Sequence, residues 1–322
     1  MLVDIVNCTF KDCTEAGIYG LSAGLGGATI GGPYSYNPIL KPTISNCVFD
    51  NTGDGIKVLT TGNVGGPTGY GSAGSASPRV VGSIFKNLSG AALNLENSPT
   101  SGASQPIFEN NTVVASIRGV VTMNPYDVII RNNIFTKTGT AIRRTGTIGA
   151  AVHHNLFFGN SLNFDGYPVS YGQITHLTDL GFPVDIASNI FHEPGFENST
   201  NLTLSANSAA VDGGDPGQGF NDGCLPPARG STRNDIGAYG GPQSCSWSLT
   251  TEAVPATVHG DVFFVLKITG SVGKRYSILS RLAIDDPVGV VLTNIVLQDS
   301  PQFWMDPDPA HRQGRFYSVI PQ

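Results

Sequence analysis

A recurring phrase constrains the fold of this chain more than any other feature of its sequence. The phrase is a small polar residue, an aliphatic residue and an aromatic or aliphatic one, several polar residues, then Gly or Ala and an aliphatic residue. Three clear copies are Asn46-Cys47-Val48-Phe49 to Gly55-Ile56, Gly82-Ser83-Ile84-Phe85 to Ala92-Leu93, and Asn132-Asn133-Ile134-Phe135 to Ala141-Ile142. Weaker copies begin at Asn7, Asn110, His154 and Ser188.

The spacing of the copies indicates a solenoid. In each copy we take as a marker the aromatic or aliphatic residue that follows the aliphatic one. The markers are Phe10, Phe49, Phe85, Val113, Phe135, Phe157 and Phe191, and successive markers are separated by 39, 36, 28, 22, 22 and 34 residues. A fixed minimum with variable additions is expected when each coil needs a set number of residues and insertions leave at turns. The short alternating runs, broken by Gly and Asn, favour β-strands over helical repeats. We therefore predict stacked parallel strands.

In such a stack, equivalent side chains lie one above another at the strand spacing and form ladders. The markers are then predicted to stack inside the coils. The column two residues earlier holds Cys8, Cys47, Ser83, Asn111, Asn133, Asn155 and Asn189. Asn side chains in that column are expected to hydrogen-bond backbone groups at the turns that would otherwise be buried without a partner.

With these coils, the chain resembles the bacterial parallel β-helix proteins of the pectate-lyase-like superfamily. Two later phrases, Ser208-Ala209-Ala210-Val211-Asp212-Gly213-Gly214-Asp215-Pro216 and Arg233-Asn234-Asp235-Ile236-Gly237-Ala238-Tyr239-Gly240-Gly241, resemble the closing segment of secreted β-helix proteins with the so-called choice-of-anchor region. The resemblance implies an all-β, right-handed parallel β-helix over residues 1–245, and a secreted or cell-surface location.

The charged residues of the closing segment have two interpretations. They are expected to hold the last loops together over the open end of the stack, which would prevent association between the exposed strand edges of two molecules. Calcium bound by the carboxylates is the alternative. The residues concerned are Asp212, Asp215, Arg233 and Asp235.

Residues 246–322 differ from the coils in composition and in sequence pattern, and we predict that they form a small β-sandwich accessory module. Glycine becomes rarer, and β-rich runs occur at 262–269, 276–279, 288–297 and 316–320. Short strands separated by turns are typical of a sandwich. Trp304 and Tyr317 are candidates for stacking on sugar rings, with packing in a core or at a domain interface as the alternative.

Charge and hydropathy exclude two kinds of partner. The net charge is −6 and no dense run of Lys and Arg occurs, so nucleic acid is not expected as a partner. No apolar stretch approaches the roughly 20 residues that span a bilayer, so no membrane span is predicted. The pattern of a strand begins at the second residue, which favours a secretion signal or a capping segment upstream of the sequence given.

None of the five cysteines has the paired short spacing of a zinc site, so no metal ligands are assigned. Cys224 and Cys245 bracket a loop-rich stretch in which a disulfide would hold irregular chain, and that pairing and two separate thiols both remain open. Because five is an odd number, at least one thiol stays unpaired. Cys8 and Cys47 are interpreted as small buried hydrophobic residues.

A candidate site follows from aligning the strands that end each copy of the phrase. Tyr19, Lys57, Asn94 and Arg143 then form one outward column, with either Val121 or Thr122 between the last two. Loops rich in Gly, Ser, Tyr and Pro follow these strands at 21–42, 60–78 and 97–106, and long loops on a rigid scaffold often carry binding residues. We expect a groove along this face that holds a polysaccharide.

The residue types suggest a polysaccharide lyase acting on an acidic glycan. Elimination next to a uronic carboxylate needs a base, a carboxylate clamp and an acid, so the expected roles are Lys57 as base if its pKa is lowered, Arg143 as clamp and Tyr19 as platform or acid. The alternative is that these are ordinary solvated residues on an outward face. The substrate-binding candidates are Asn94, Glu96, Arg144 and Asp54. No cofactor is assigned, with calcium as the alternative. A non-catalytic carbohydrate-binding or adhesion protein is the alternative function.

Hydrolysis is less favoured than elimination. Asp54 and Glu96 are the only acids near the column, and they occupy different positions along the coil, so they form a weak glycosidase pair. The Asn-Thr-Asp, paired Asp and Gly-His-Gly motifs of β-helical polygalacturonases are absent at matching coils. His153 and His154 adjoin the sixth coil, where we expect one ring to point inward and the other outward in a structural role.

Overall fold

The computed structural model of this protein describes residues 2–23, 25–29, 32–36, 39–63, 72–97, 105–123, 127–146, 151–248, 250–258, 261–270, 272–281, 290–299, 301–306 and 316–321. The chain divides into two compact units, which are treated separately below. Unit 1 comprises residues 1–223 and 228–243, and unit 2 comprises residues 224–227 and 244–322.

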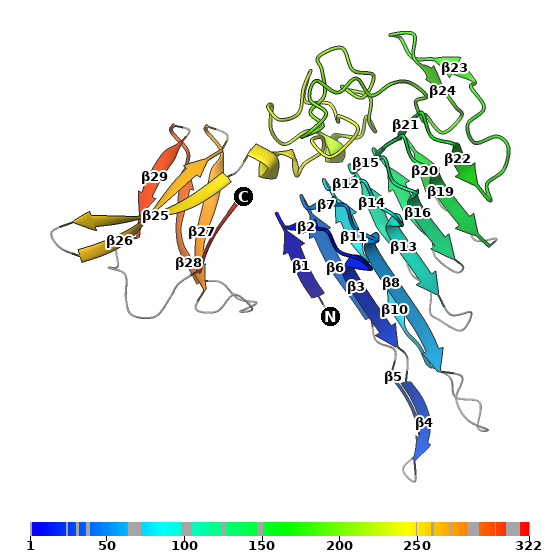
Figure 1. Ribbon diagram of the computed structural model, residues 1–322, viewed down its shortest axis with the longest axis horizontal. Coiled ribbons are helices and arrows are strands. Elements are labelled where there is room, and N and C mark those ends of the chain that lie inside the picture. Colours follow the sequence, from blue (N-terminus) through cyan, green and yellow to red (C-terminus); the bar gives the residue numbers. More distant parts are fainter. Residues whose placement is uncertain are drawn as a thin grey trace. The chain divides into compact units, whose positions relative to one another are not determined.

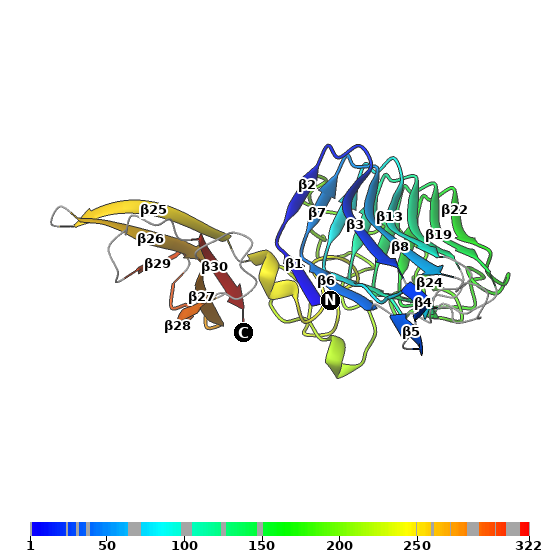
Figure 2. The ribbon, with the colours of Figure 1, turned by 90° about the horizontal axis from the view of Figure 1, so that it is seen from below.

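Unit 1 is a right-handed parallel β-helix with three sheets, and each coil contributes one strand to each sheet (Figure 1, Figure 2). The first sheet contains β1 (Leu2–Val6), β6 (Ile39–Ser45), β11 (Arg79–Val81), β14 (Ile107–Glu109), β17 (Ile129–Arg131) and β20 (Ala151–His153). The second contains β2 (Thr9–Lys11), β7 (Val48–Asp50), β12 (Ile84–Lys86), β15 (Thr112–Val114), β18 (Ile134–Thr136) and β21 (Leu156–Phe158). The third contains β3 (Ala16–Ala23), β8 (Asp54–Asn63), β13 (Ala91–Asn97), β16 (Arg118–Met123), β19 (Thr140–Thr145) and β22 (Leu162–Asp165). The predicted solenoid is confirmed.

The insertions leave the coils after strands of the third sheet, as predicted. In the first insertion, β4 (Leu25–Thr29) and β5 (Gly32–Tyr36) pair as an antiparallel hairpin. In the second, β9 (Ser72–Ala73) pairs with β8, and β10 (Ser75–Ala76) pairs with β6. Residues 98–104 of the third insertion lie outside the described residues.

The marker residues form the core of the coil stack in the predicted order. Backbone pairing places Phe10, Phe49, Phe85, Val113, Phe135 and Phe157 directly above one another. Neighbouring rings stack, with centroids 4.8 Å apart for Phe10 and Phe49 and 4.7 Å apart for Phe49 and Phe85. Phe191 continues the stack on Phe157 at 5.7 Å.

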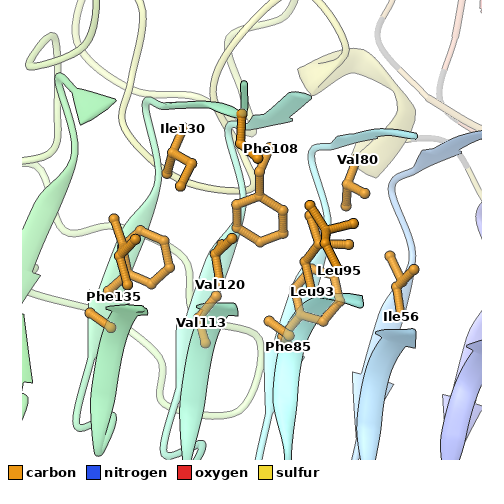
Figure 3. Packing of buried hydrophobic residues seen from close by; sticks show 14 of the residues in the cluster. Ile56, Val80, Phe85, Leu93, Leu95, Phe108, Val113, Val120, Ile130 and Phe135 are labelled. Atoms are coloured by element: carbon orange, nitrogen blue, oxygen red, sulfur yellow. The ribbon is translucent and has the colours of Figure 1, made fainter. Parts of the chain in front are cut away.

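Val113 interrupts the column of rings, and a residue from another sheet fills the gap. Phe108 of β14 lies fully buried between the rings of Phe85 and Phe135, with centroids 5.7 Å and 6.2 Å away (Figure 3). Packing at the density of a protein interior requires such a replacement, because a missing ring would leave a cavity.

The second residue of the first five strands of the third sheet is Gly or Ala, and its small size is a packing requirement. A Cβ atom on Gly55 would lie 2.6 Å from the ring of Phe85, and one on Gly119 would lie 2.7 Å from the ring of Phe135. The ring of the next coil therefore occupies the space of the missing side chain, which explains why the phrase has Gly or Ala there.

The predicted polar column is a continuous, fully buried hydrogen-bonded ladder. The backbone N–H groups of Ser83, Asn111, Asn133 and Asn155 each donate to the side chain of the next coil, and the acceptors are Oδ1 atoms of Asn111, Asn133, Asn155 and Asn189 at 2.9–3.0 Å. The Nδ2 groups donate to backbone carbonyls, among them Phe108 O from Asn133 at 2.8 Å. Asp185 ends the ladder by accepting from Asn189 N–H at 2.9 Å.

The closing segment does not cover the open end of the stack, and that prediction is wrong. After β23 (His176–Leu177) and β24 (Pro183–Val184), the chain turns back along the corner between the first and second sheets. Asn132 Oδ1 accepts from Asp215 N–H, Asn110 Nδ2 donates to Asp235 O, and Asn46 Nδ2 donates to Gln243 O. The segment therefore runs back from the fifth coil to the second, with η1 (Gln218–Phe220) on its way.

The left-handed turn at this corner explains the path of the closing segment. Asn46, Asn110 and Asn132 have φ values of 54°, 49° and 58°, a conformation that Asn tolerates better than most residues. These three turns therefore each present a side-chain amide at the corner, and the backbone of the closing segment binds to the row of amides.

Unit 2 is a small antiparallel β-sandwich, as predicted. One sheet has the order β25 (Thr250–Val258), β26 (Asp261–Thr269), β29 (Gln302–Met305), and the other β28 (Val290–Val296), β27 (Arg275–Arg281), β30 (Phe316–Pro321). The predicted β-rich runs did not include β25 or β29. The core consists of Leu266, Ile268, Tyr276, Ile278, Leu297 and Val319, and Trp304 and Tyr317 pack against it.

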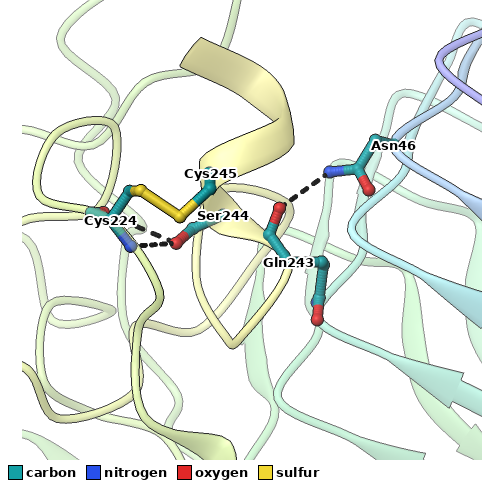
Figure 4. The surroundings of a disulfide bond; sticks show 5 residues. All are labelled: Asn46, Cys224, Gln243, Ser244 and Cys245. Carbon is teal, nitrogen blue, oxygen red and sulfur yellow. Dashed lines mark hydrogen bonds between the residues drawn. A yellow bond between two sulfur atoms is a disulfide. The ribbon is translucent and has the colours of Figure 1, made fainter. Parts of the chain in front are cut away.

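The disulfide left open by the sequence is formed. Cys224 and Cys245, both in unit 2, are bonded, and Ser244 of η2 (Ser244–Ser248) accepts a hydrogen bond from Cys224 N–H (Figure 4). Cys8, Cys13 and Cys47 carry unpaired thiols. Burial raises the pKa of the Cys47 thiol to about 12, in keeping with its interpretation as a small hydrophobic residue.

Candidate functional site

Backbone register brings the predicted column together on the third sheet. Pairing aligns Tyr19 with Lys57, Lys57 with Asn94, Asn94 with Val121, and Val121 with Arg143. The preceding position in each strand is a hydrophobic residue of the core, half-buried in the first strand and fully buried in the other four, so the column faces outward. Val121 is the one member of the column that is buried, at 5% exposure. Val121, not Thr122, belongs to the column, and Asp165 of β22 extends it beyond Arg143.

Four side chains at the upstream end of the column form one polar network. Lys57 Nζ lies 2.9 Å from Glu96 Oε1, and both side chains are 31% exposed. Asn94 Nδ2 donates to Asp54 Oδ2 at 2.8 Å and to Glu96 Oε1 at 3.2 Å. Asp54 Oδ1 accepts from the backbone N–H of Ala91 at 2.7 Å. We call these four residues, Asp54, Lys57, Asn94 and Glu96, the carboxylate–amide network.

The network brings Asp54 and Glu96 together although they occupy different positions along the coil. Because both accept from Asn94 Nδ2, at 2.8 Å and 3.2 Å, their oxygens lie at most about 6 Å apart. Paired carboxyl groups of glycosidases are separated by roughly 5 to 9.5 Å. Spacing along the sequence did not show this proximity, because it depends on the amide of Asn94 reaching both ways along the sheet.

Lys57 does not meet the condition for a general base. The hydrogen bond from its ammonium group to Glu96 raises the pKa of Lys57, and the charges of Glu96 and Asp54 act in the same direction against a smaller effect of burial. A lysine base needs the opposite shift, towards neutral pH. Lys57 is therefore a cation at neutral pH, suited to binding an anionic group.

Arg143 shares the face with Lys57 but not its immediate surroundings. Three strand spacings separate their positions, roughly 14 Å at ~4.8 Å each. Arg143 Nε lies 3.4 Å from Asp165 Oδ2, and the Arg143 side chain is 46% exposed. Tyr19, on the other side of Lys57, is 57% exposed. The two cations can therefore contact separate points of one extended ligand.

Arg144 does not belong to this face. Its position aligns with Thr122, which is buried in the neighbouring column of β16. At the sixth coil the stack ends, and the guanidinium group donates to Gly166 O at 2.8 Å and lies over the ring of Tyr167 at 4.8 Å. Arg144 therefore closes the last coil and is not placed to bind a substrate with Arg143.

The rings of His153 and His154 meet, which corrects the expectation that they point in opposite directions. Their Nδ1 atoms lie 3.0 Å apart, and both residues are half-buried. The reason is that His154 has φ 55° at the corner turn, so its side chain returns to the side of His153. Burial lowers the pKa of both imidazoles.

Three carboxylates of the closing segment, those of Asp212, Asp222 and Asp235, accept hydrogen bonds from the segment's own backbone and hydroxyl groups. Asp235 Oδ1 accepts from Asp212 N–H and its Oδ2 from Arg229 N–H, while Asp212 accepts from Ser231. Asp222, which the sequence did not single out, accepts from Asp235 and Gly241 N–H groups. Burial raises the pKa of Asp222 to about 8 and that of Asp235 to about 7.

Two cavities lie on the closing half of unit 1, away from the column. One of about 350 Å³ is lined by residues including Asp179, Phe182 and Arg233, and one of about 230 Å³ by residues including Lys137, Phe158 and Phe196. Neither contains a residue of the outward column. Across the described ranges, no helix combines the length and apolar character needed to cross a membrane.

Comparisons with known proteins found no matching family model, no matching curated protein and no matching solved structure. The class of this protein is therefore defined by its own fold and surface: a right-handed parallel β-helix with an antiparallel β-sandwich, carrying a column with three charged side chains and one amide on one lateral sheet.

Proposed function

We propose that the outward face of the third sheet binds an acidic polysaccharide. The observation that carries this proposal is the shared column of Lys57, Asn94 and Arg143, which places two cations and an amide along one line. An extended polymer can contact positions about 14 Å apart at once, whereas a small ligand cannot. The carboxylate–amide network supplies the donors and acceptors that sugar hydroxyls need, and each cation is suited to a uronic carboxylate.

A secreted or cell-surface location fits this proposal. The disulfide of Cys224 and Cys245 is a bond that forms and persists in oxidising compartments. The resemblance to pectate-lyase-like proteins, carried by the coil phrase, adds support for a glycan as the partner.

The test is binding to a panel of glycans. Lys57→Ala and Arg143→Ala are expected to weaken binding of a uronic acid polymer at least about tenfold, with weaker binding at high salt because exposed charges are screened. Lys86→Ala is the matched control, since Lys86 forms a similar ion pair with Asp50 on the second sheet at 3.3 Å. Calorimetry measures the affinity of each variant for the acidic polymer and for a neutral glucan. Equal binding by Lys57→Ala and the unaltered protein would contradict the proposal.

Hydrolysis of the bound glycan is a second candidate, favoured by the proximity of Asp54 and Glu96. If these carboxyl groups act as a pair, Asp54→Asn and Glu96→Gln each abolish release of reducing ends while binding persists. Elimination is distinguished by absorbance of an unsaturated product. It requires Lys57 to give up its proton, which the ion pair with Glu96 opposes. Binding without either product identifies a non-catalytic binding protein.

A further inference from the structure

We propose that His153, His154 and Asp215 form a binding site for a divalent transition metal such as zinc, which joins the closing segment to the coil stack. Among the described residues, this is the only group of three or more His, Cys, Asp and Glu side chains whose ligand atoms all lie within 4.8 Å of one another. The site lies on the corner between the first and second sheets, apart from the proposed glycan-binding face.

The distances suit a single metal ion after small side-chain movements. The two Nδ1 atoms are 3.0 Å apart, and His153 Nδ1 lies 3.9 Å from Asp215 Oδ2. Ligand atoms of a tetrahedral zinc site, with bonds of about 2.05 Å, lie roughly 3.3 Å from one another. The observed distances fall on either side of this value, and three protein ligands leave the fourth position open for water.

The surrounding structure holds the carboxylate in place for this role. Asn132 Oδ1 accepts from the backbone N–H of Asp215 at 2.9 Å, and Gly217 N–H donates to Asp215 Oδ1 at 3.0 Å. One carboxylate oxygen is thus held by backbone while the other faces His153. Such outer contacts orient metal ligands. Asn132, whose Oδ1 holds the backbone of Asp215, is fully buried, and its Nδ2 has no hydrogen-bond partner among the described residues.

The two histidines are departures from what other coils place at the same corner. His154 occupies the turn position that holds Asn46, Gly82, Asn110 and Asn132 in earlier coils, where the asparagine amides contact the closing segment directly. At the sixth coil, an imidazole replaces the amide where Asp215 passes. A metal bound between them supplies the same connection between coil and closing segment.

Ligand type and nearby charge select the metal. Two imidazoles and one carboxylate suit zinc and copper, whereas calcium and magnesium prefer oxygen ligands alone. Arg131 in the adjacent strand and Arg233 both oppose a positive charge at the histidines. The Arg131 guanidinium group donates to Glu109 Oε2 at 2.7 Å and 2.9 Å, and the buried Glu109, which also pairs with Arg79, offsets part of this repulsion on an incoming cation.

The experiment is zinc titration by calorimetry of the full chain after treatment with a chelator. One ion is expected to bind per chain, with affinity reduced at least about tenfold in His154→Ala and in Asp215→Asn. Asp215→Asn retains the oxygen that accepts from Gly217, so it tests the ligand without removing the turn. Visible absorption after loading with cobalt reports whether the coordination is tetrahedral.

His176→Ala and His192→Ala are the controls, because both histidines are exposed and lie outside the group. Both controls are expected to bind zinc like the unaltered protein. Zinc affinity unchanged in both His154→Ala and Asp215→Asn, or no binding by the unaltered chain, would overturn the proposal. If His154→Ala is misfolded by circular dichroism, the result with Asp215→Asn decides.

Discussion

At the residue scale, the asparagine ladder does more for this fold than the polar residues of most cores. Asn133 accepts from Asn111 N–H and donates to the carbonyls of Phe108 and Arg131, so one side chain satisfies three backbone groups in two successive coils. The side chain is fully buried, and water cannot replace these bonds. Sulfur and hydroxyl groups of Cys47 and Ser83 continue the ladder in earlier coils with fewer bonds.

We predict that Asn133→Ala lowers the free energy of unfolding by about 2 to 4 kcal/mol, because each buried group left without a partner costs roughly 1 to 3 kcal/mol. Urea unfolding followed by circular dichroism measures the change. Asn201→Ala is the control, since Asn201 is exposed and, among the described residues, its side chain accepts only from Thr203. A loss in Asn133→Ala no larger than in Asn201→Ala would show that the ladder is not stabilising.

At the scale of elements, the coil stack was predictable and the closing segment was not. A parallel register passes from strand to strand within a sheet, so the phrase aligned Phe49 with Phe85 in the second sheet, and its Gly/Ala-aliphatic pair aligned Lys57 with Asn94 in the third. The path of the closing segment depends instead on side-chain amides that left-handed turns place along a corner. Similarly, the meeting of His153 with His154 depends on a backbone angle that residue type alone does not specify.

The buried acids of the closing segment predict that acid stabilises it. Asp222 and Asp235 have ordinary pKa values of 3.8, which burial raises to about 8 and about 7 in the folded chain. Between the ordinary and the raised pKa values, the folded chain binds more protons than the unfolded chain. The stability that these two acids contribute is therefore complete below pH ~4 and is lost as the pH rises through 7 to 8.

Thermal unfolding across this range, with protection of the segment from protease as a second measurement, tests the prediction. The midpoint is expected to fall by roughly 5 °C or more between pH 5 and pH 8. Asp222→Asn removes one titrating group and is expected to flatten the dependence. A midpoint that rises with pH over this interval would contradict it.

At the scale of the whole molecule, the chain has cores that belong to different units. The ring stack of Phe49, Phe85 and Phe135 belongs to the β-helix, and the cluster around Tyr276 and Ile278 belongs to the sandwich. Each unit buries its own hydrophobic residues. Units with separate cores generally do not unfold in one two-state transition.

We therefore predict two transitions in scanning calorimetry. Ile278→Ala is expected to destabilise the sandwich by about 2 to 5 kcal/mol and to shift only one transition, because Ile278 is fully buried in that core. Val113→Ala, in the coil stack, is the matched substitution for the other transition. A single transition that both substitutions shift equally would show that the units unfold together.

The ladder and the ring stack also bear on how such a chain changes in length during evolution. Asn111 and Asn133, like Val113 and Phe135, are separated by 22 residues and bond to the coils on either side in the same way. Duplication or loss of one complete coil therefore joins matching surfaces and leaves the interior closed. Each such event lengthens or shortens each of the three lateral sheets by one strand, so the length of the stack can be adjusted in fixed increments.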